Sequence, residues 1–103
     1  MASSKDYLDF VLDQLSLLHP ISYKAMMGEY ILYYRGKIVG GIYDDRLLVK
    51  PTASAKRLMP DAPNEIPYEG AKPMLLVEEI DDREFLRDLF NAMEGELSAP
   101  KKP

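Results

Sequence analysis

A chain of 103 residues has the length of one domain, and its hydrophobic content of 47% is enough for one core, which argues against intrinsic disorder. The absence of cysteine excludes disulfides, thiolate nucleophiles and cysteine-ligated metal sites. The net charge of −4 is uneven, because residues 24–57 carry seven basic side chains against three acidic ones, whereas residues 61–96 carry eleven acidic against three basic.

The first predicted element is a helix over about residues 4–18. Apolar side chains recur there at helical spacing, at Leu8, Val11, Leu12, Leu15 and Leu18. Ser3 or Ser4 is a suitable N-cap for this helix. Pro20 ends it, because the residue before a proline is disfavoured in helical geometry.

Residues 23–50 predict an antiparallel meander of three strands, because β-branched and aromatic residues alternate there with turn signals. Strands over residues 30–34 and 38–43 flank a tight turn at Gly36, and a third runs from residue 46 to Lys50. Pro51 ends the third strand because it has no N–H to donate. Gly40 and Gly41 lie inside the middle strand, where a bulge or a close helix would explain them.

The later half predicts a short helical segment over residues 52–59, with Thr52 or Ser54 at its start and residues 58–59 facing inward. Four prolines then favour an irregular loop in which Tyr68 is an anchor. Residues 74–77 predict a buried fourth strand. The final helix is expected to begin at Asp81, which forms a capping box with Glu84, and to expose its acidic and basic side chains on one face.

These elements predict an α+β fold with the order αβββ(α)βα. We expect a two-layer sandwich in which N- and C-terminal helices pack on an antiparallel sheet of about four strands. The expected single domain spans residues 1–103, with order over about 4–97 and a flexible tail at 98–103. The first residues lack a leader pattern and no apolar run could span a bilayer, so we expect a cytoplasmic protein that does not contact membranes.

The segment from Lys24 to Lys50 carries a longer ordered pattern. A basic residue precedes Met26-Met27-Gly28, a strand with Tyr30 follows, then a Gly-Lys turn and an Asp-Asp-x-Leu-x-x-Lys element. The residues of this pattern are Met26, Met27, Gly28, Tyr30, Gly36, Lys37, Asp45, Leu47 and Lys50. It resembles the N-terminal domain of the TfoX/Sxy competence regulators, and the resemblance extends over about residues 4–97.

Two positions depart from the family pattern. Met27 stands where many members have Phe, and Glu29 stands where many have a second Gly. The resemblance implies a regulatory or protein-interaction domain that acts with a partner such as a transcription factor in DNA transformation. It implies no catalytic residues and no cofactor.

The sequence also argues against an enzyme on its own terms. His19 is the single histidine, so Ser-His-Asp and Cys-His constellations are impossible, and exposure or helix capping explains this residue. The acidic pairs at 44–45, 78–79 and 81–82 lack the spacing of a calcium loop, and turns and a helix start explain them. We therefore predict no catalytic, metal or cofactor site.

Two other functions are compatible with the sequence. A nucleic-acid-binding surface could form from the basic and tyrosine residues of the meander and the segment after it, namely Lys24, Tyr34, Arg35, Lys37, Arg46, Lys50, Lys56 and Arg57. The acidic pI of about 4.9 argues against it. A small-ligand-binding domain or an enzyme would need a pocket with convergent polar groups, which sequence cannot show. If helices cover only one sheet face, a homodimer could bury the other.

Overall fold

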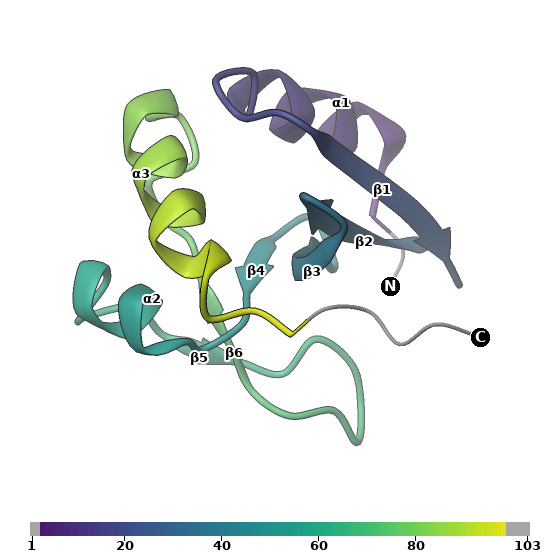
Figure 1. Cartoon of the computed structure of the whole chain (residues 1–103). Coiled ribbons are helices and arrows are strands. Elements are labelled where there is room, and N and C mark those ends of the chain that lie inside the picture. Colours follow the sequence, from purple (N-terminus) through teal and green to yellow (C-terminus); the bar gives the residue numbers. More distant parts are fainter. Residues whose placement is uncertain (1–2, 99–103) are drawn as a thin grey trace.

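Three helices and six strands form over residues 3–98, the part of the chain that the structure, a computed structural model, describes (Figure 1). In chain order they are α1 Lys5–Gln14, β1 Ile21–Met26, β2 Glu29–Tyr34, β3 Lys37–Ile42, β4 Leu47–Val49, α2 Ala53–Leu58, β5 Asn64–Glu65, β6 Met74–Leu76 and α3 Arg83–Glu94. The expected flexible tail at 98–103 lies outside the described residues, apart from Ser98.

The six strands make one antiparallel sheet with the order β1-β2-β3-β4-β6-β5. Two-residue turns join β1 to β2 and β2 to β3, and all four turn residues have positive φ, as this type of hairpin requires. The predicted α+β class is confirmed. The sheet has six strands instead of about four, because β1 and β5 were not predicted.

Strand β1 escaped prediction because five of its six residues are exposed, so it has no alternating apolar pattern. Strand β5 is only two residues long and lies among prolines, where no periodicity can develop. Both strands are held by backbone pairing to neighbours, β1 along the whole of β2 and β5 to β6. They are edge strands whose existence depends on the sheet rather than on their own side chains.

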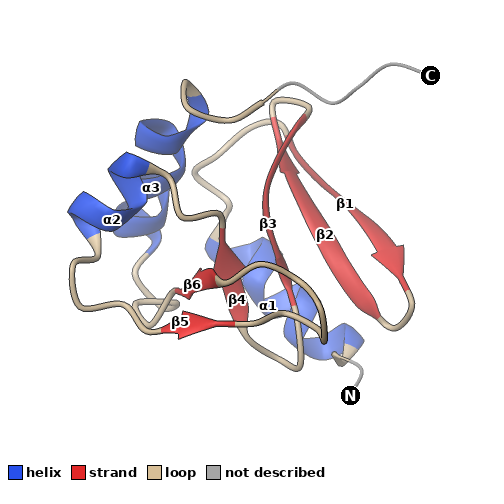
Figure 2. Ribbon diagram, turned by 90° about the horizontal axis from the view of Figure 1, so that it is seen from below, coloured by secondary structure: helices blue, strands red, loops and turns tan. Residues whose placement is uncertain are grey.

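The core lies on one face of the sheet. Side chains from α1 and α3 meet Leu32, Tyr34 and Ile42 from the sheet there, and all are buried. In Figure 2, α1 passes behind the long strands while the loop that joins β5 to β6 passes in front of them. Side chains alternate along a strand, so each strand presents one set to the helices and the other set to the opposite face. That opposite face is covered only by the loop between β5 and β6.

Helix α1 is shorter than predicted. The Ser4 hydroxyl caps it by accepting from the Tyr7 N–H at 3.1 Å, as expected, but the helix ends at Gln14 instead of about residue 18. The next residues form tight turns, in which the Leu18 N–H donates to the Leu15 carbonyl at 3.0 Å. These turns bury Leu18 in the core and lead the chain directly into β1.

The other helices also refine the predictions. Thr52 caps α2 by accepting from the Ala55 N–H at 3.1 Å, as predicted. Residues 58 and 59 were both expected to face inward; Met59 is buried, but Leu58 is exposed. The N-cap of α3 is Asp82, one residue after the predicted Asp81, because its carboxylate accepts from the Phe85 N–H at 3.0 Å.

The glycine pair in β3 has two structural reasons. A bulge interrupts the pairing of β2 with β3 between Leu32 and Tyr33. A bulge was one of the two explanations expected for these glycines. The close neighbour is a strand instead of a helix: a Cβ at Gly40 would lie 2.1 Å from the Leu48 carbonyl oxygen of β4. Any side chain at Gly40 would therefore force β4 away from β3.

Polar contacts tie α3 to the rest of the fold. Lys37 forms an ion pair with Glu94 at 2.9 Å, which lowers the pKa of Glu94. The Glu96 carboxylate accepts from the N–H of Ser54 at 3.0 Å and from its hydroxyl at 2.7 Å, so it joins the end of α3 to the start of α2. These two hydrogen bonds lower the pKa of Glu96 below its usual 4.5, and the bond from the Ser54 backbone N–H has the larger effect.

This lowered pKa predicts a pH-dependent contribution to stability. The ionised Glu96 is favoured in the folded state, so its contribution is fully present above the unfolded pKa of 4.5 and is lost as pH falls through the lower folded value. Urea unfolding should therefore show Glu96→Gln less stable than the wild type by a constant amount above about pH 5.5, and by a shrinking amount below about pH 4.5.

The matched control is Glu69→Gln in the exposed loop between β5 and β6, which should change the free energy of unfolding little at any pH. A destabilisation by Glu96→Gln that persists undiminished at pH 3 would contradict the assigned role of these hydrogen bonds.

Candidate functional site

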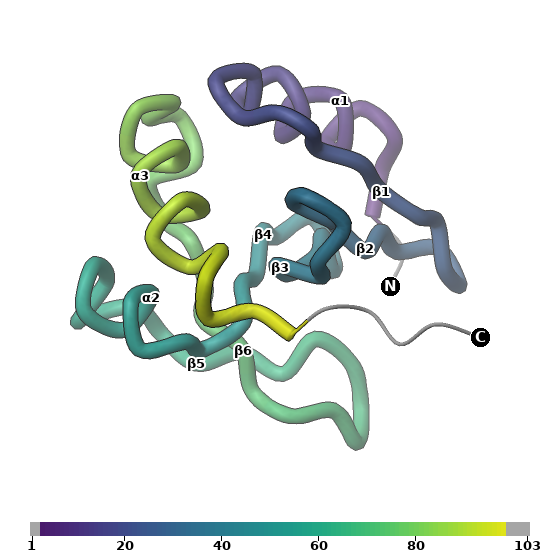
Figure 3. The backbone as a smooth tube through the Cα atoms, viewed as in Figure 1, coloured from purple at the N-terminus to yellow at the C-terminus, as the bar shows by residue number. Residues whose placement is uncertain are grey.

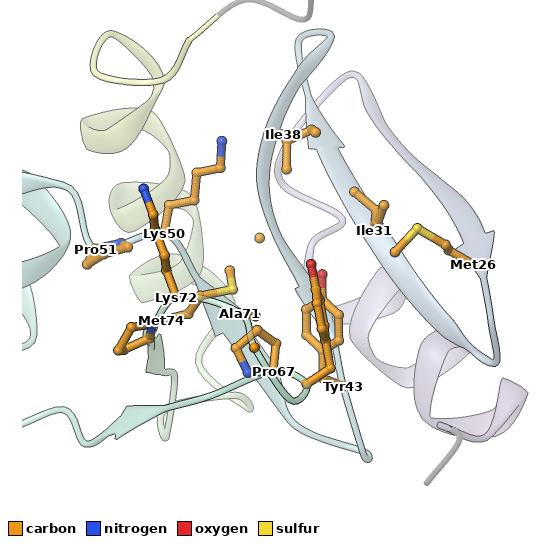
Figure 4. Close-up of a pocket in the computed structure, with 14 residues that line it drawn as sticks. Met26, Ile31, Ile38, Tyr43, Lys50, Pro51, Pro67, Ala71, Lys72 and Met74 are labelled. Atoms are coloured by element: carbon orange, nitrogen blue, oxygen red, sulfur yellow. The ribbon is translucent and has the colours of Figure 1, made fainter.

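A hollow opens on the sheet face that the helices leave uncovered. Its volume is about 590 Å³, and β1, β2, β3 and β6 line it together with the loop between β5 and β6. Figure 3 shows this loop on the side of the sheet opposite α1. The lining is mostly apolar, with Ile31, Ile38 and Met74 among its side chains (Figure 4).

The wall of this hollow depends on Gly41. A Cβ there would lie 2.6 Å from the ring of Tyr43 and 2.6 Å from the Tyr30 carbonyl oxygen. The missing side chain therefore leaves the space in which the Tyr43 ring lies back over the sheet. The Tyr43 ring in turn packs against Tyr68, with ring centroids 6.2 Å apart.

Tyr43 and Tyr68 thereby hold the loop over the open face. The prediction that Tyr68 anchors this loop agrees with this contact, although 56% of Tyr68 is exposed. Burial raises the pKa of Tyr43, and the neighbouring Tyr68 and Glu29 raise it further. The Tyr43 hydroxyl is thus a stable hydrogen-bond donor that points into the hollow (Figure 4).

Apolar side chains also gather at the outer edge of the hollow. We call Met26, Met27 and Tyr68 the methionine rim; together with Glu29 and Tyr43 they line a second depression of about 400 Å³. Met27 lies at the tip of the turn between β1 and β2, with φ of 53°, and 96% of it is exposed. The rim is therefore a solvent-facing apolar surface adjoining the hollow.

Glu29 fixes the turns behind this rim. Its carboxylate accepts from the Ser3 N–H at 2.9 Å, from the Ser3 hydroxyl, and from the Asp44 N–H at 3.2 Å. The turn between β3 and β4 is also tied to the N-terminal segment, because Asp45 accepts from the Ser4 N–H at 2.8 Å. The glutamate that replaces a glycine of the family pattern thus has a structural role in this chain.

The remaining pattern residues have identifiable places. Gly28 and Gly36 occupy positive-φ turn positions, with φ of 85° and 79°, which glycine adopts without strain. Tyr30 packs edge-on against Tyr23 with centroids 5.8 Å apart, and Leu47 is in the core. The pattern therefore specifies the turns and strands that surround the open face.

The candidate nucleic-acid residues are distributed over several parts of the structure. Tyr34 is buried in the core and donates its hydroxyl to Asn91, and Arg35 lies over the Tyr34 ring. Lys37 and Arg46 are ion-paired with Glu94 and Glu65. The others lie in three separate places: Lys24 on β1, Lys50 beside the hollow after the end of β4, and Lys56 and Arg57 on α2.

Lys50 is the one candidate that lies at the hollow. Sequence reasoning did not select its neighbours there, Lys72, Ile31 and Ile38. Lys72 comes from the proline-rich loop, whose path over the sheet has no sequence signal. Ile31 and Ile38 are apolar residues of predicted strands, and from sequence such residues are expected in the core and not at a site.

Within residues 3–98, no three His, Cys, Asp or Glu side chains lie close enough together to hold a metal ion. His19 is exposed in the segment between α1 and β1. None of the helices over the same residues has the length and hydropathy needed to cross a membrane.

The fold and the hollow define a small α+β domain with one helix-covered and one open sheet face. Residues 13–92 match the TfoX N-terminal domain family, and because this match covers most of the chain, the chain belongs to that family. The resemblance in the sequence is thereby confirmed. The family is not known for enzymatic activity.

A relative is known in Spirochaeta aurantia, described as an uncharacterized 12.7 kDa protein in the trpE 5′ region. It is 32% identical to this chain over 102 residues, which cover 98% of this chain and 89% of the relative. No solved structure shows a significant match.

The dependence of the hollow on Gly41 predicts a specific effect of substitution. Gly41→Ala should lower the free energy of unfolding by about 1–3 kcal/mol, because the new Cβ overlaps the Tyr43 ring and a backbone oxygen. The control is Gly95→Ala, where nothing lies within 4 Å and φ is −70°; it should be neutral or stabilise by up to about 1 kcal/mol.

Urea unfolding measures both variants, and nuclear Overhauser contacts between the Tyr43 and Tyr68 rings report on the loop. These contacts should weaken in Gly41→Ala and persist in Gly95→Ala. Equal stability of the two variants with unchanged ring contacts would show that Gly41 does not position Tyr43.

Proposed function

We propose that this chain is a non-enzymatic regulatory domain that binds a protein partner through the methionine rim. The family supports this proposal, because the TfoX/Sxy competence regulators that the sequence resembles act with a transcription factor. In the proposal the partner is a transcription factor, the process is DNA transformation, and the domain acts in the cytoplasm.

The exposure of Met27 is the observation that carries the proposal. A non-glycine residue at positive φ is strained, and an apolar side chain that is 96% exposed gains no burial to offset that strain. Methionine is flexible and polarisable, which suits it to contact surfaces. A partner that covers Met27 would supply the burial that the isolated domain lacks.

Charge supports a basic protein partner over direct binding to nucleic acid. The chain carries a net charge of −4, and the acidic side chains of residues 61–96 far outnumber the basic ones. A net negative charge repels phosphates at long range and attracts basic proteins, such as DNA-binding proteins. Two of the candidate phosphate contacts, Lys37 and Arg46, are already neutralised by carboxylates.

Photo-crosslinking in the native host tests the proposal. A photoreactive phenylalanine analogue at Met27 should crosslink to a transcription factor, whereas the same analogue at Leu17, which is exposed between α1 and β1, should not. In calorimetric titration with that purified factor, Met27→Ser should weaken binding by about tenfold or more, which corresponds to about 1.4 kcal/mol. Leu17→Ser should bind as the wild type does.

Three outcomes would reject the proposal. Crosslinks from Met27 only to a second copy of the chain would show that the rim is a homodimer interface. Retention of the domain on DNA at low salt, lost steeply as salt rises, would favour the nucleic-acid alternative. Equal loss of partner binding in Met27→Ser and Leu17→Ser would show that the rim is not the contact surface.

A further inference from the structure

The hollow on the open face has the properties of a small-molecule site. Its volume of about 590 Å³ lies within the range of about 300–1,000 Å³ that is typical of ligand pockets. Ile31 and Ile38 of the sheet line one side, and Met74 of β6 lines another (Figure 4). Such a lining favours a ligand with an aliphatic body, since burial of that body removes apolar surface from water.

Two amino groups give one end of this hollow a positive charge. Lys50 follows β4 and Lys72 belongs to the loop between β5 and β6, so the fold brings them together from distant parts of the sequence. Both side chains line the hollow, and in Figure 4 they lie across it from Ile31 and Met26. No Asp or Glu is among the residues that line the hollow.

Neither lysine is neutralised within the part of the chain that the structure describes. The ion pairs between residues 3 and 98 involve Lys5, Lys37, Arg46, Arg83 and Arg87. Lys50 and Lys72 are absent from these pairs, so both charges are available to a ligand. An apolar pocket with two ammonium groups in its lining is complementary to an anionic group on an apolar molecule.

We propose that the hollow binds a small aliphatic carboxylate. Its carboxylate lies between the amino groups of Lys50 and Lys72, and its chain lies against Ile31, Ile38 and Met74. The Tyr43 hydroxyl, which points into the same space, can donate a further hydrogen bond. The hollow adjoins the methionine rim, because Met26 and Tyr68 line both. The two proposals are tested at residues that are not shared, since Met27 lies outside the hollow and Lys50 lies outside the rim.

Methyl NMR titration with three probes of equal chain length tests the site. Decanoate, decanol and decylamine are added below their aggregation concentrations to protein with labelled Ile and Met methyl groups. Decanoate should cause saturable shifts at Ile31, Ile38 and Met74 and bind about tenfold more tightly than decanol, which corresponds to about 1.4 kcal/mol of charge attraction. Decylamine should bind most weakly.

Charge reversal separates recognition from simple hydrophobic binding. Lys50→Glu should weaken decanoate by about tenfold or more and strengthen decylamine, so that the order of the two probes reverses. The control is Lys56→Glu on the exposed face of α2, outside the hollow, which should leave all three affinities unchanged. A gain of decylamine binding that shifts the methyl groups of Ile31, Ile38 and Met74 shows that the hollow is still formed in the variant.

Equal affinity for the three probes would overturn the proposal, as would decanoate shifts confined to methyl groups outside the hollow or an equal effect of Lys56→Glu. The test is independent of the proposed function. Met27→Ser should leave decanoate binding unchanged, and Lys50→Glu should leave partner binding unchanged, so failure of one proposal does not imply failure of the other.

Discussion

The absence of a side chain at Gly41 is the constraint on which the open face depends. The Tyr43 ring occupies the space that a Cβ at this position would need, 2.6 Å away. Because Tyr43 lies there, Tyr68 can pack against it and hold the loop between β5 and β6 over the sheet. The missing side chain at Gly41 thus allows Tyr43 and Tyr68 to form one wall of the hollow. Gly40 matters for the neighbouring strand, because the absence of a side chain there allows the backbone of β4 to lie close to β3.

The two sheet faces differ in burial and in local charge. The helix-covered face contains the buried side chains of α1 and α3 and supplies most of the apolar burial that stabilises the fold. The open face has a partly exposed apolar lining, and its local charge is opposite to that of the chain: Lys50 and Lys72 line it without an acidic residue, although the net charge is −4. Local charge, rather than net charge, decides what such a hollow attracts.

Much of the fold could be predicted from the sequence, because local patterns determine it. Helical spacing in residues 8–15, the turn glycine Gly36 and the caps of the helices gave the class, the central strands and both long helices. Strands β1 and β5 could not be predicted, since backbone pairing rather than side-chain pattern defines them. The end of α1 at Gln14 was missed because the tight turns after it continue the apolar pattern as far as Leu18.

The candidate site was less predictable than the fold. The sequence selected Lys50 and the methionines of the rim, but it gave no reason to place Lys72 beside Lys50, because the loop that carries Lys72 has no periodic pattern. It also treated Lys37 and Arg46 as free cations, whereas the structure pairs them with Glu94 and Glu65. Such pairings join residues far apart in the sequence, and only the tertiary structure determines them.

The central claim is that one sheet face is covered and the other is open to solvent. Solvent paramagnetic relaxation with a neutral gadolinium chelate measures this directly on the methyl groups of neighbouring strands in the monomeric domain. We expect strong broadening at Met26, Ile31 and Ile38 and little at Leu32, Val39 and Ile42, which are fully buried. Equal protection of Ile31 and Ile42 would contradict the account, because it would mean that both faces of the sheet are covered.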